Sequence, residues 1–196
     1  MKKEKILSNI KTEYDKLWIY FLSFAIMGWI YEVCIMHFEM GYGFINRGFL
    51  FGPYIPLYGC GGLFILAATH KIRSKKIKIL GINISPIVNI VLIMIISTLL
   101  ELITSYTVEW ILGERLWDYT YYGPNFQGRI ALKSTLQFGL LGLVGLYVVY
   151  PLDNLFIKKT KGTKPILYNV IVYTTMGIFA ADLIARIFLG SNYTGP

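Results

Sequence analysis

The apolar residues of this chain come in long blocks, and this feature most limits what the chain can fold into. Hydrophobic residues make up 55% of the sequence and charged residues only 15%, whereas a soluble domain carries about 25% charged residues. Blocks of this length are typical of helices that cross a lipid bilayer. We therefore predict an all-α, polytopic helical membrane protein with a single transmembrane domain.

The positions of the blocks predict about five transmembrane helices. Along the chain they cover approximately residues 18–36, 55–69, 85–112, 129–150 and 165–189. Residues 1–17 are expected to form an amphipathic helix on the cytoplasmic membrane surface. The transmembrane domain then covers 18–190, and 191–196 form a short external tail. The glycine- and aromatic-rich segment 37–54 is expected to be an external loop or a re-entrant segment.

Basic residues gather on one side of this topology. Fourteen of the 19 lysines and arginines form three clusters separated by pairs of apolar blocks: Lys2, Lys3, Lys5, Lys11 and Lys16; Lys71, Arg73, Lys75, Lys76 and Lys78; Lys158, Lys159, Lys161 and Lys164. By the positive-inside rule these clusters and the N-terminus are expected to lie on the cytoplasmic face of the membrane. The net charge of +8 therefore indicates membrane lipids as partners and no nucleic acid.

Cysteine usage and sequence motifs exclude several kinds of chemistry. Cys34 and Cys60 lie in apolar segments, where we expect buried free thiols, with a disulfide as the alternative. No metal-ligand spacing or cofactor motif is present, so we expect neither a metal nor a cofactor. The chain also lacks the ATP-binding loop G-x-x-x-x-G-K-[ST], H-E-x-x-H and G-x-S-x-G. These absences leave open whether the protein is an enzyme.

The first four spans read as two related helical hairpins followed by one more helix. An acid lies late in the first helix of each hairpin, at Glu32 and Glu101. An Arg-x-x-Leu sequence then leads into the returning helix, at Arg47 and Arg129, followed by an aromatic–glycine pair. Both copies have the same orientation, as in the parallel repeats of some transporters.

Acidic side chains inside apolar blocks cost free energy in a membrane, so their presence requires a structural or functional explanation. Glu101, Ser105 and Glu109 are spaced four residues apart, so they share one face of a helix. Arg129, Lys133 and Gln137 have the same spacing and are expected to form a matching face on the next helix. Glu101 is either structural, paired with Arg129 or Lys133, or functional.

Two further acids have candidate partners of their own. Glu32 has Arg47 as its candidate partner, with the same structural and functional alternatives. Asp182 and Arg186, four residues apart, are expected to form a mainly structural ion pair.

We predict an outward-facing polar pocket between the two hairpins. Its arginines would bind the ligand, because the arginine side chain suits carboxylates and phosphates. Its expected lining and mouth comprise Glu32, Arg47, Tyr54, Tyr58, Glu101, Glu109, Asp118, Tyr119, Gln127 and Arg129. Many of the aromatic residues near Trp117 also fit an interfacial aromatic belt.

Two separated motifs resemble those of a known bacterial family. The first is Asn46-Arg47-Gly48-Phe49-Leu50 with Gly52-Pro53, Pro56 and Tyr58-Gly59; the second is Leu116-Trp117-Asp118-Tyr119 with Asn125, Gly128-Arg129 and Ser134. The family is called putative ABC-transporter type IV, or CmpB-like, and the resemblance covers about residues 19–155. A tryptophan is expected where this chain has Phe138. The resemblance implies a multi-span protein of the cytoplasmic membrane.

These observations favour a permease for an anionic or zwitterionic ligand, in which Glu101 exchanges protons or cations. If the protein belongs to an ABC transporter, a separate ATPase subunit must dock on the cytoplasmic loops. The first alternative is a membrane-embedded enzyme or flippase for a lipid or lipid-linked substrate, with Glu101 or Asp118 as general base. The second is a non-catalytic membrane scaffold or sensor. Glycine-rich helix faces such as Gly59–Gly62 also suggest a homo-oligomer.

Overall fold

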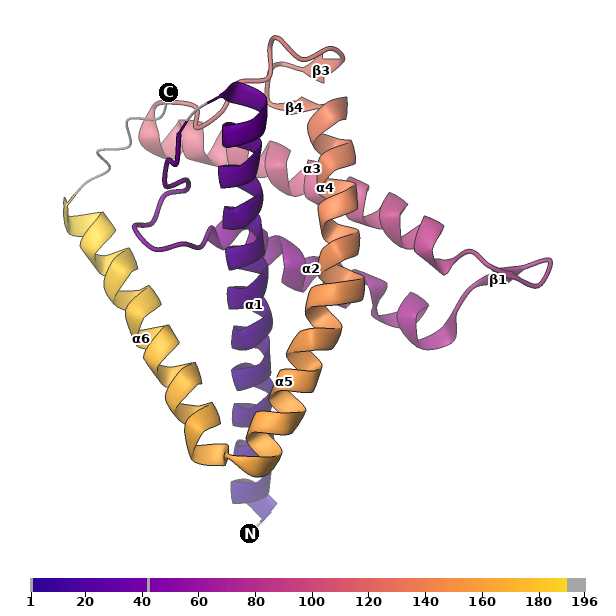
Figure 1. Ribbon diagram of the computed structural model, residues 1–196, viewed down its shortest axis with the longest axis vertical. Helices are drawn as coiled ribbons and strands as arrows, with labels where there is room; N and C mark the ends of the chain where they lie inside the picture. The colour runs from indigo at the N-terminus through magenta and orange to yellow at the C-terminus, as the bar shows by residue number, and fades with distance from the viewer. Residues whose placement is uncertain (1, 42, 190–196) are drawn as a thin grey trace. The chain divides into compact units, whose positions relative to one another are not determined.

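The computed structural model describes residues 2–41 and 43–189, and over these ranges it is all-α (Figure 1). Counted as continuous rods, the described residues form five long helices. They are α1 (Lys2–Met40), α2 (Pro56–Lys75), α3 (Ser85–Leu112), a rod composed of α4 (Leu132–Val144), the π-helical turn η1 (Gly145–Val149) and α5 (Tyr150–Thr163), and α6 (Pro165–Leu189). Two short antiparallel hairpins pair β1 (Lys78–Ile79) with β2 (Ile82–Asn83) and β3 (Asn125–Phe126) with β4 (Ile130–Ala131).

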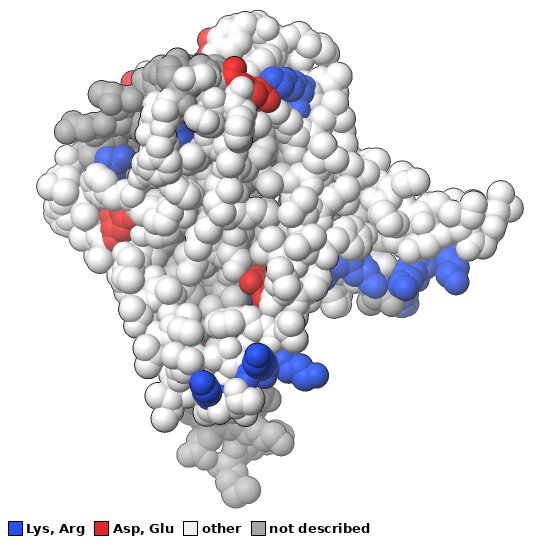
Figure 2. Space-filling view, viewed as in Figure 1, with Lys and Arg blue, Asp and Glu red and all other residues white. Residues whose placement is uncertain are grey.

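Four helices are long and apolar enough to cross a membrane. They are Thr12–Glu39, Ser85–Leu112, Leu132–Thr163 and Pro165–Leu189, and most of the face seen in Figure 2 carries neither acidic nor basic residues. The protein is thus a multi-pass membrane protein. The segment predicted as the second span is helical, but α2 is not among the four, because its last turns carry Lys71, Arg73 and Lys75. A fifth crossing by α2 stays a prediction.

From Lys2 on, the segment predicted to form an amphipathic surface helix over residues 1–17 is continuous with the first span, and its place on the membrane surface stays a prediction. Helix α1 runs without a break from Lys2 to Met40, because no glycine or proline occurs between Lys2 and Met27 to end it. The side chains of residues 2–11, which would show the amphipathic face, lie outside the described residues, as does the predicted tail 191–196.

The fourth predicted span also needs correction at both ends. Residues 129–131 precede the helix, so Arg129 does not share a helical face with Lys133 and Gln137. At the other end the rod continues past Tyr150 to Thr163. Pro151 lacks the N–H that a regular helix needs, and the π-helical turn just before it shifts the hydrogen-bond pattern so that the helix can continue.

The described helices fall into two compact units, each of which is considered by itself. One consists of Met1–Leu63 with Val148–Thr194, and the other contains Phe64–Tyr147. The boundaries cross α2 and the end of η1. The first unit therefore holds α1, the start of α2, α5 and α6, while the second holds α3, α4 and both β-hairpins.

In the second unit, α3 and α4 are packed antiparallel along their length. Asn89 on α3 hydrogen-bonds Tyr147 near the end of η1, at 2.8 Å. Near the other end of the pair, Thr98 bonds Thr135 at 2.9 Å. Between them Gly142 lies so close to Ile93 that a Cβ at residue 142 would clash. Glycine therefore permits the close approach of the two helices.

In the first unit, α1 packs against α2, α5 and α6. Gly59 and Gly62 of α2 bring it close to Phe21 and Phe24 of α1. The buried core consists of Ala25, Leu50 and Tyr54, with Leu22, Ile26, Phe49 and Phe179 packed around it. The segment after α1 is thus anchored in the core of its unit.

The same glycine contacts recur in the two hairpins. Gly62 meets Phe24, eight residues before Glu32, and Gly142 meets Ile93, eight residues before Glu101. Three residues earlier, Gly59 lies against Phe21, eleven residues before Glu32. Gly139 lies closest to Met94 and also near Ile90, which is eleven residues before Glu101.

Candidate functional site

The main polar cluster of the second unit lies where the C-terminal half of α3 meets the loop before α4. Glu101 and Ser105 are buried in the contact between the two helices, with 4% of each residue exposed. Glu109 follows two turns after Glu101 on the same face and is about one-third exposed. The polar stripe predicted on this helix therefore faces protein, as the cost of polar groups in lipid requires.

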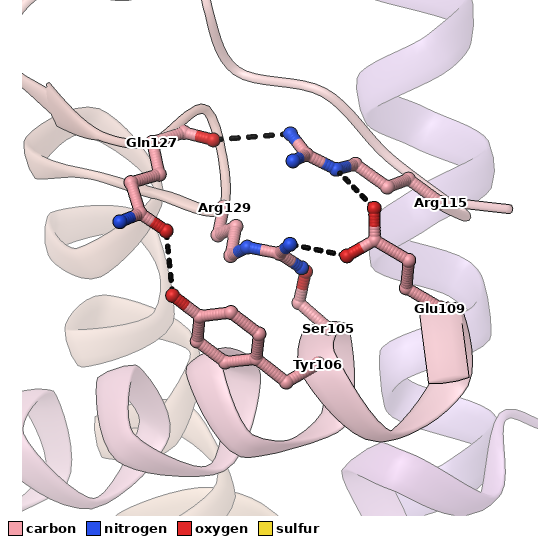
Figure 3. Close-up of polar contacts among 6 residues, drawn as sticks. All are labelled: Ser105, Tyr106, Glu109, Arg115, Gln127 and Arg129. Atoms are coloured by element: carbon pink, nitrogen blue, oxygen red, sulfur yellow. Dashed lines mark hydrogen bonds and ion pairs between the residues drawn. The ribbon is translucent and has the colours of Figure 1, made fainter. Parts of the chain in front are cut away.

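Arg129 is the centre of this cluster (Figure 3). It sits at the end of the loop, just before β4, and is only 5% exposed. Its guanidinium donates to Ser105 Oγ at 3.0 Å and to a carboxylate oxygen of Glu109. It also lies 3.8 Å from the centroid of the Tyr106 ring. Its Nε atom is buried without a hydrogen-bond partner.

A second arginine shares the Glu109 carboxylate. Arg115 Nε donates to the other oxygen of Glu109 at 3.1 Å, and Arg115 NH1 donates to the backbone oxygen of Gln127 at 3.1 Å. The Gln127 side chain accepts from the Tyr106 hydroxyl, so Gln127 is bonded both to α3 and to Arg115 just after α3. Figure 3 shows the two arginines reaching different oxygens of the Glu109 carboxylate.

The Glu101 carboxylate is bonded to two hydroxyl groups. It accepts from Tyr119 Oη at 2.9 Å and from Ser134 Oγ at 3.5 Å. Of the two bases predicted to pair with it, Arg129 binds Glu109 instead. Lys133 lies 4.5 Å from the centroid of the Tyr122 ring, and its pairing with Glu101 stays a prediction. The sequence spacing misplaced Arg129 because it assumed that this residue was helical.

The loop 113–128 owes its shape to local hydrogen bonds. Asp118 Oδ1 accepts from the Thr120 amide at 2.9 Å, and Asn125 Oδ1 accepts from the Gly128 amide at 2.9 Å. Gly128 has φ +67° and lies against Asp118, a position that only glycine occupies without strain. Asp118 is therefore a turn residue that presents Tyr119 to Glu101, and the aromatic Trp117 donates to Arg129 O at 2.9 Å.

The predicted site residues of the first unit make two separate contacts. Tyr58 Oη donates to Glu32, and Arg47 is an electrostatic neighbour of Glu32, so that a Glu32–Arg47 pair stays a prediction. Tyr54 is buried and donates to Asp182 Oδ2 at 2.6 Å. Burial and this carboxylate raise the pKa of the Tyr54 phenol, so it remains a hydrogen-bond donor at neutral pH.

Asp182 and Arg186 of α6 bind the 46–54 segment, which sequence reasoning missed. Asp182 accepts from the amides of Phe51 at 3.0 Å and Gly52 at 2.8 Å. Arg186 donates to the carbonyl of Phe49. The two side chains attract each other electrostatically, but their hydrogen bonds go to the loop. No spacing in the sequence reveals a contact between residues about 130 positions apart.

Arg115 and Tyr106 were also missed as members of the Arg129 cluster. Arg115 lies just after α3 and Tyr106 next to Ser105, but neither belongs to a regular spacing. The ten predicted residues thus divide into Glu32, Arg47, Tyr54 and Tyr58 in the first unit and the other six in the second. A single pocket lined by all ten stays a prediction.

Metal and thiol chemistry find little support in the part of the chain that the structure describes. Within 2–41 and 43–189 no three His, Cys, Asp or Glu residues are grouped as metal ligands. Cys34 and Cys60 are free thiols, and both are exposed. The expectation that they are buried was wrong, because within the described residues each side chain lies on an exposed side of its helix.

Four long apolar helices and polar clusters packed between helices define a polytopic α-helical membrane protein. The family model described as "Putative ABC-transporter type IV" matches residues 19–187. The chain belongs to this family, as its two motifs suggested, and the match extends through α6 beyond the range in which those motifs lie. No curated protein and no solved structure matches the chain.

Proposed function

We propose that the protein is a permease whose ligand is a small anionic or zwitterionic molecule held by Arg129. The observation that carries this proposal is a guanidinium that is 5% exposed and has a buried Nε without a partner. Arginine binds planar carboxylates and phosphates through two parallel N–H donors. Because Nε has no partner, one edge of the Arg129 guanidinium can donate hydrogen bonds to such a ligand.

The two arginines on Glu109 suggest how binding would proceed. An incoming anion takes the place of Glu109 on Arg129, while Glu109 keeps its bond to Arg115. Arg115 then balances the charge of Glu109, and the negative group of an anionic or zwitterionic ligand balances the charge of Arg129. Glu101, held by Tyr119 and Ser134, would exchange a proton or a cation as the pocket opens outward.

We also infer that the two hairpins are repeats with parallel roles. The glycine contacts eight and eleven residues before Glu32 and Glu101 support this inference. In this proposal Glu32 and Arg47 serve in the first hairpin as Glu101 and Arg129 serve in the second. Tyr54 and Tyr58 would border the access to Glu32 and Arg47 in the first hairpin. Asp118, Tyr119 and Gln127 would do so for Glu101 and Arg129 in the second.

The test is solute flux in proteoliposomes with a matched pair of variants. Purified protein is reconstituted with phosphate, glutamate and glycine inside, and the solutes remaining are quantified by mass spectrometry. We expect unmodified solute to leave, and Arg129→Gln to reduce the flux at least tenfold. Lys158→Gln, which removes an exposed base of α5 outside the Arg129 cluster, should keep most of it. Equal flux from both variants would contradict the role of Arg129.

A second candidate is an enzyme or flippase for a lipid or lipid-linked phosphate. It is favoured by Trp110 and Tyr106 on α3, which are 85% and 44% exposed beside the Arg129 cluster, as residues that contact a lipid would be. Chemical change of a lipid by the purified protein would favour the enzyme, and lipid transfer without change the flippase. Neither activity, together with a stable complex, would favour a scaffold or sensor.

The partners follow from the same proposal. Membrane lipids cover the exposed apolar faces, and ABC-type transport requires a separate ATPase subunit. Purification from the native host with no ATPase present would count against that subunit. Homo-oligomerisation through glycine faces has less support, because Gly59, Gly62, Gly139 and Gly142 pack within the chain.

A further inference from the structure

Asp153 is a buried acid that the proposed ligand site does not use. It lies on α5 in the first unit and is 8% exposed. Ser23 Oγ of α1 donates to Asp153 Oδ1 at 2.9 Å. The second oxygen, Oδ2, is buried and has no hydrogen-bond partner.

Among the described residues, Asp153 has no basic partner. Over the described residues, no Lys, Arg or His forms an ion pair with it. Lys161, further along α5, donates to Thr12 on α1 at 3.0 Å. The electrostatic neighbours of the nearby Tyr20 are Tyr150 on α5, Glu13 on α1, Tyr168 on α6 and Asp153 itself, none of them basic.

A carboxylate buried without a counter-ion is unfavourable, because it loses the solvation of water without compensation. A proton removes the charge and converts one oxygen into a neutral hydroxyl group. The Ser23 hydroxyl can still donate to the other oxygen. The geometry around Asp153 therefore suits the neutral acid much better than the anion.

We propose that Asp153 is a proton-binding site of this protein. It holds a proton while α1 and α5 are in contact and releases it when that contact opens to water. Two adjacent hydrogen bonds close the contact: Ser23 to Asp153, and Tyr20 Oη to Asn154 Oδ1 at 2.8 Å. Loss of the proton places a negative charge between the helices and favours their separation.

Asp153 also lies close to the end of α5 from which a proton would reach it. It precedes Lys158 by five residues, which is about 7.5 Å along a helix. The basic end of α5 is the end expected at the cytoplasmic surface. The site would thus exchange protons with that side of the membrane. Proton binding at Asp153 does not depend on ligand binding at Arg129.

Infrared spectroscopy tests the proposal directly, because a protonated carboxyl has a carbonyl stretching band that a carboxylate lacks. Wild-type protein and Asp153→Asn are compared in lipid nanodiscs in ²H₂O at neutral pH. We expect the band of one protonated carboxyl to be lost in Asp153→Asn. The same band should disappear from the wild type at alkaline pH. Glu13→Gln, which removes an exposed acid of α1, should leave it unchanged.

Ser23→Ala provides a second test that keeps the carboxyl. Removing the hydroxyl that donates to Asp153 should shift the band to higher frequency, because its carbonyl oxygen loses a hydrogen bond. Identical spectra of wild type and Asp153→Asn would show that the acid is ionised and would overturn the proposal. If Asp153→Asn does not fold, an unshifted band in Ser23→Ala would overturn it as well.

Discussion

Asp182 illustrates how single residues hold this protein together over long sequence separations. One carboxylate accepts hydrogen bonds from two backbone amides and one phenol of the 46–54 segment. Bonds to a charged group are stronger than neutral ones, and backbone amides without a partner are costly. Asp182 therefore anchors the first family motif to α6.

We expect Asp182→Asn to lower the free energy of unfolding by about 2 kcal/mol. The asparagine side chain is an uncharged acceptor, and its NH₂ group can face the backbone N–H groups of Phe51 and Gly52, which it cannot accept from. Hydrogen exchange at Phe51 and Gly52 should become faster. Thermal unfolding and exchange measured by mass spectrometry check both effects. Glu13→Gln, which breaks the exposed ion pair with Lys16, should cost less than about 1 kcal/mol. A similar loss in both variants would argue against the anchoring role.

At the scale of elements, close helix packing depends on a few glycines. Gly142 of α4 and Gly62 of α2 each face a large side chain of the neighbouring helix with no room for a Cβ. Some other glycines of the described chain have no such neighbour. Gly177 in α6, for example, has nothing within 4 Å of an added Cβ.

This contrast gives a matched pair of substitutions. Gly142→Ala should destabilise the protein by about 1 to 3 kcal/mol, because Ile93 or the helix must shift. Gly177→Ala should leave stability unchanged or raise it by up to about 1 kcal/mol, because alanine favours a helix. Thermal unfolding in one detergent compares the two. A neutral Gly142→Ala would mean that α3 and α4 are not in contact at this point.

At the scale of the whole molecule, the number of crossings decides the side on which each end lies. Four helices are long and apolar enough to span, and α2 would make a fifth crossing. With five crossings the two termini lie on opposite sides of the membrane. With four they lie on the same side.

We expect five crossings, with the N-terminus inside, because basic residues gather beside α1, α2 and α5. Tags placed at either end can be digested in intact spheroplasts by a protease that does not cross the membrane. Only the C-terminal tag should be removed. Protection of both tags, or loss of both, would show an even number of crossings and would place α2 on one side of the bilayer.

Much of this could be predicted from the sequence. Helix α3 begins and ends where the sequence indicated, since Pro86 favours a first turn and Gly113 adopts the left-handed φ of +76° that ends a helix. The shared face of Glu101, Ser105 and Glu109 is likewise a direct result of helical periodicity. The family follows from two local motifs.

The sequence by itself determined the all-α membrane class, because long apolar blocks leave a chain few other stable states. It also determined which helix face is polar, because the period of a helix is fixed by its backbone. Only the tertiary structure decided the hydrogen-bond partners of the charged side chains. Arg129 binds Glu109, Glu101 accepts from Tyr119, and Asp182 accepts from the 46–54 segment. Such pairs depend on how loops and helices distant in the sequence meet, and local patterns carry no information about that.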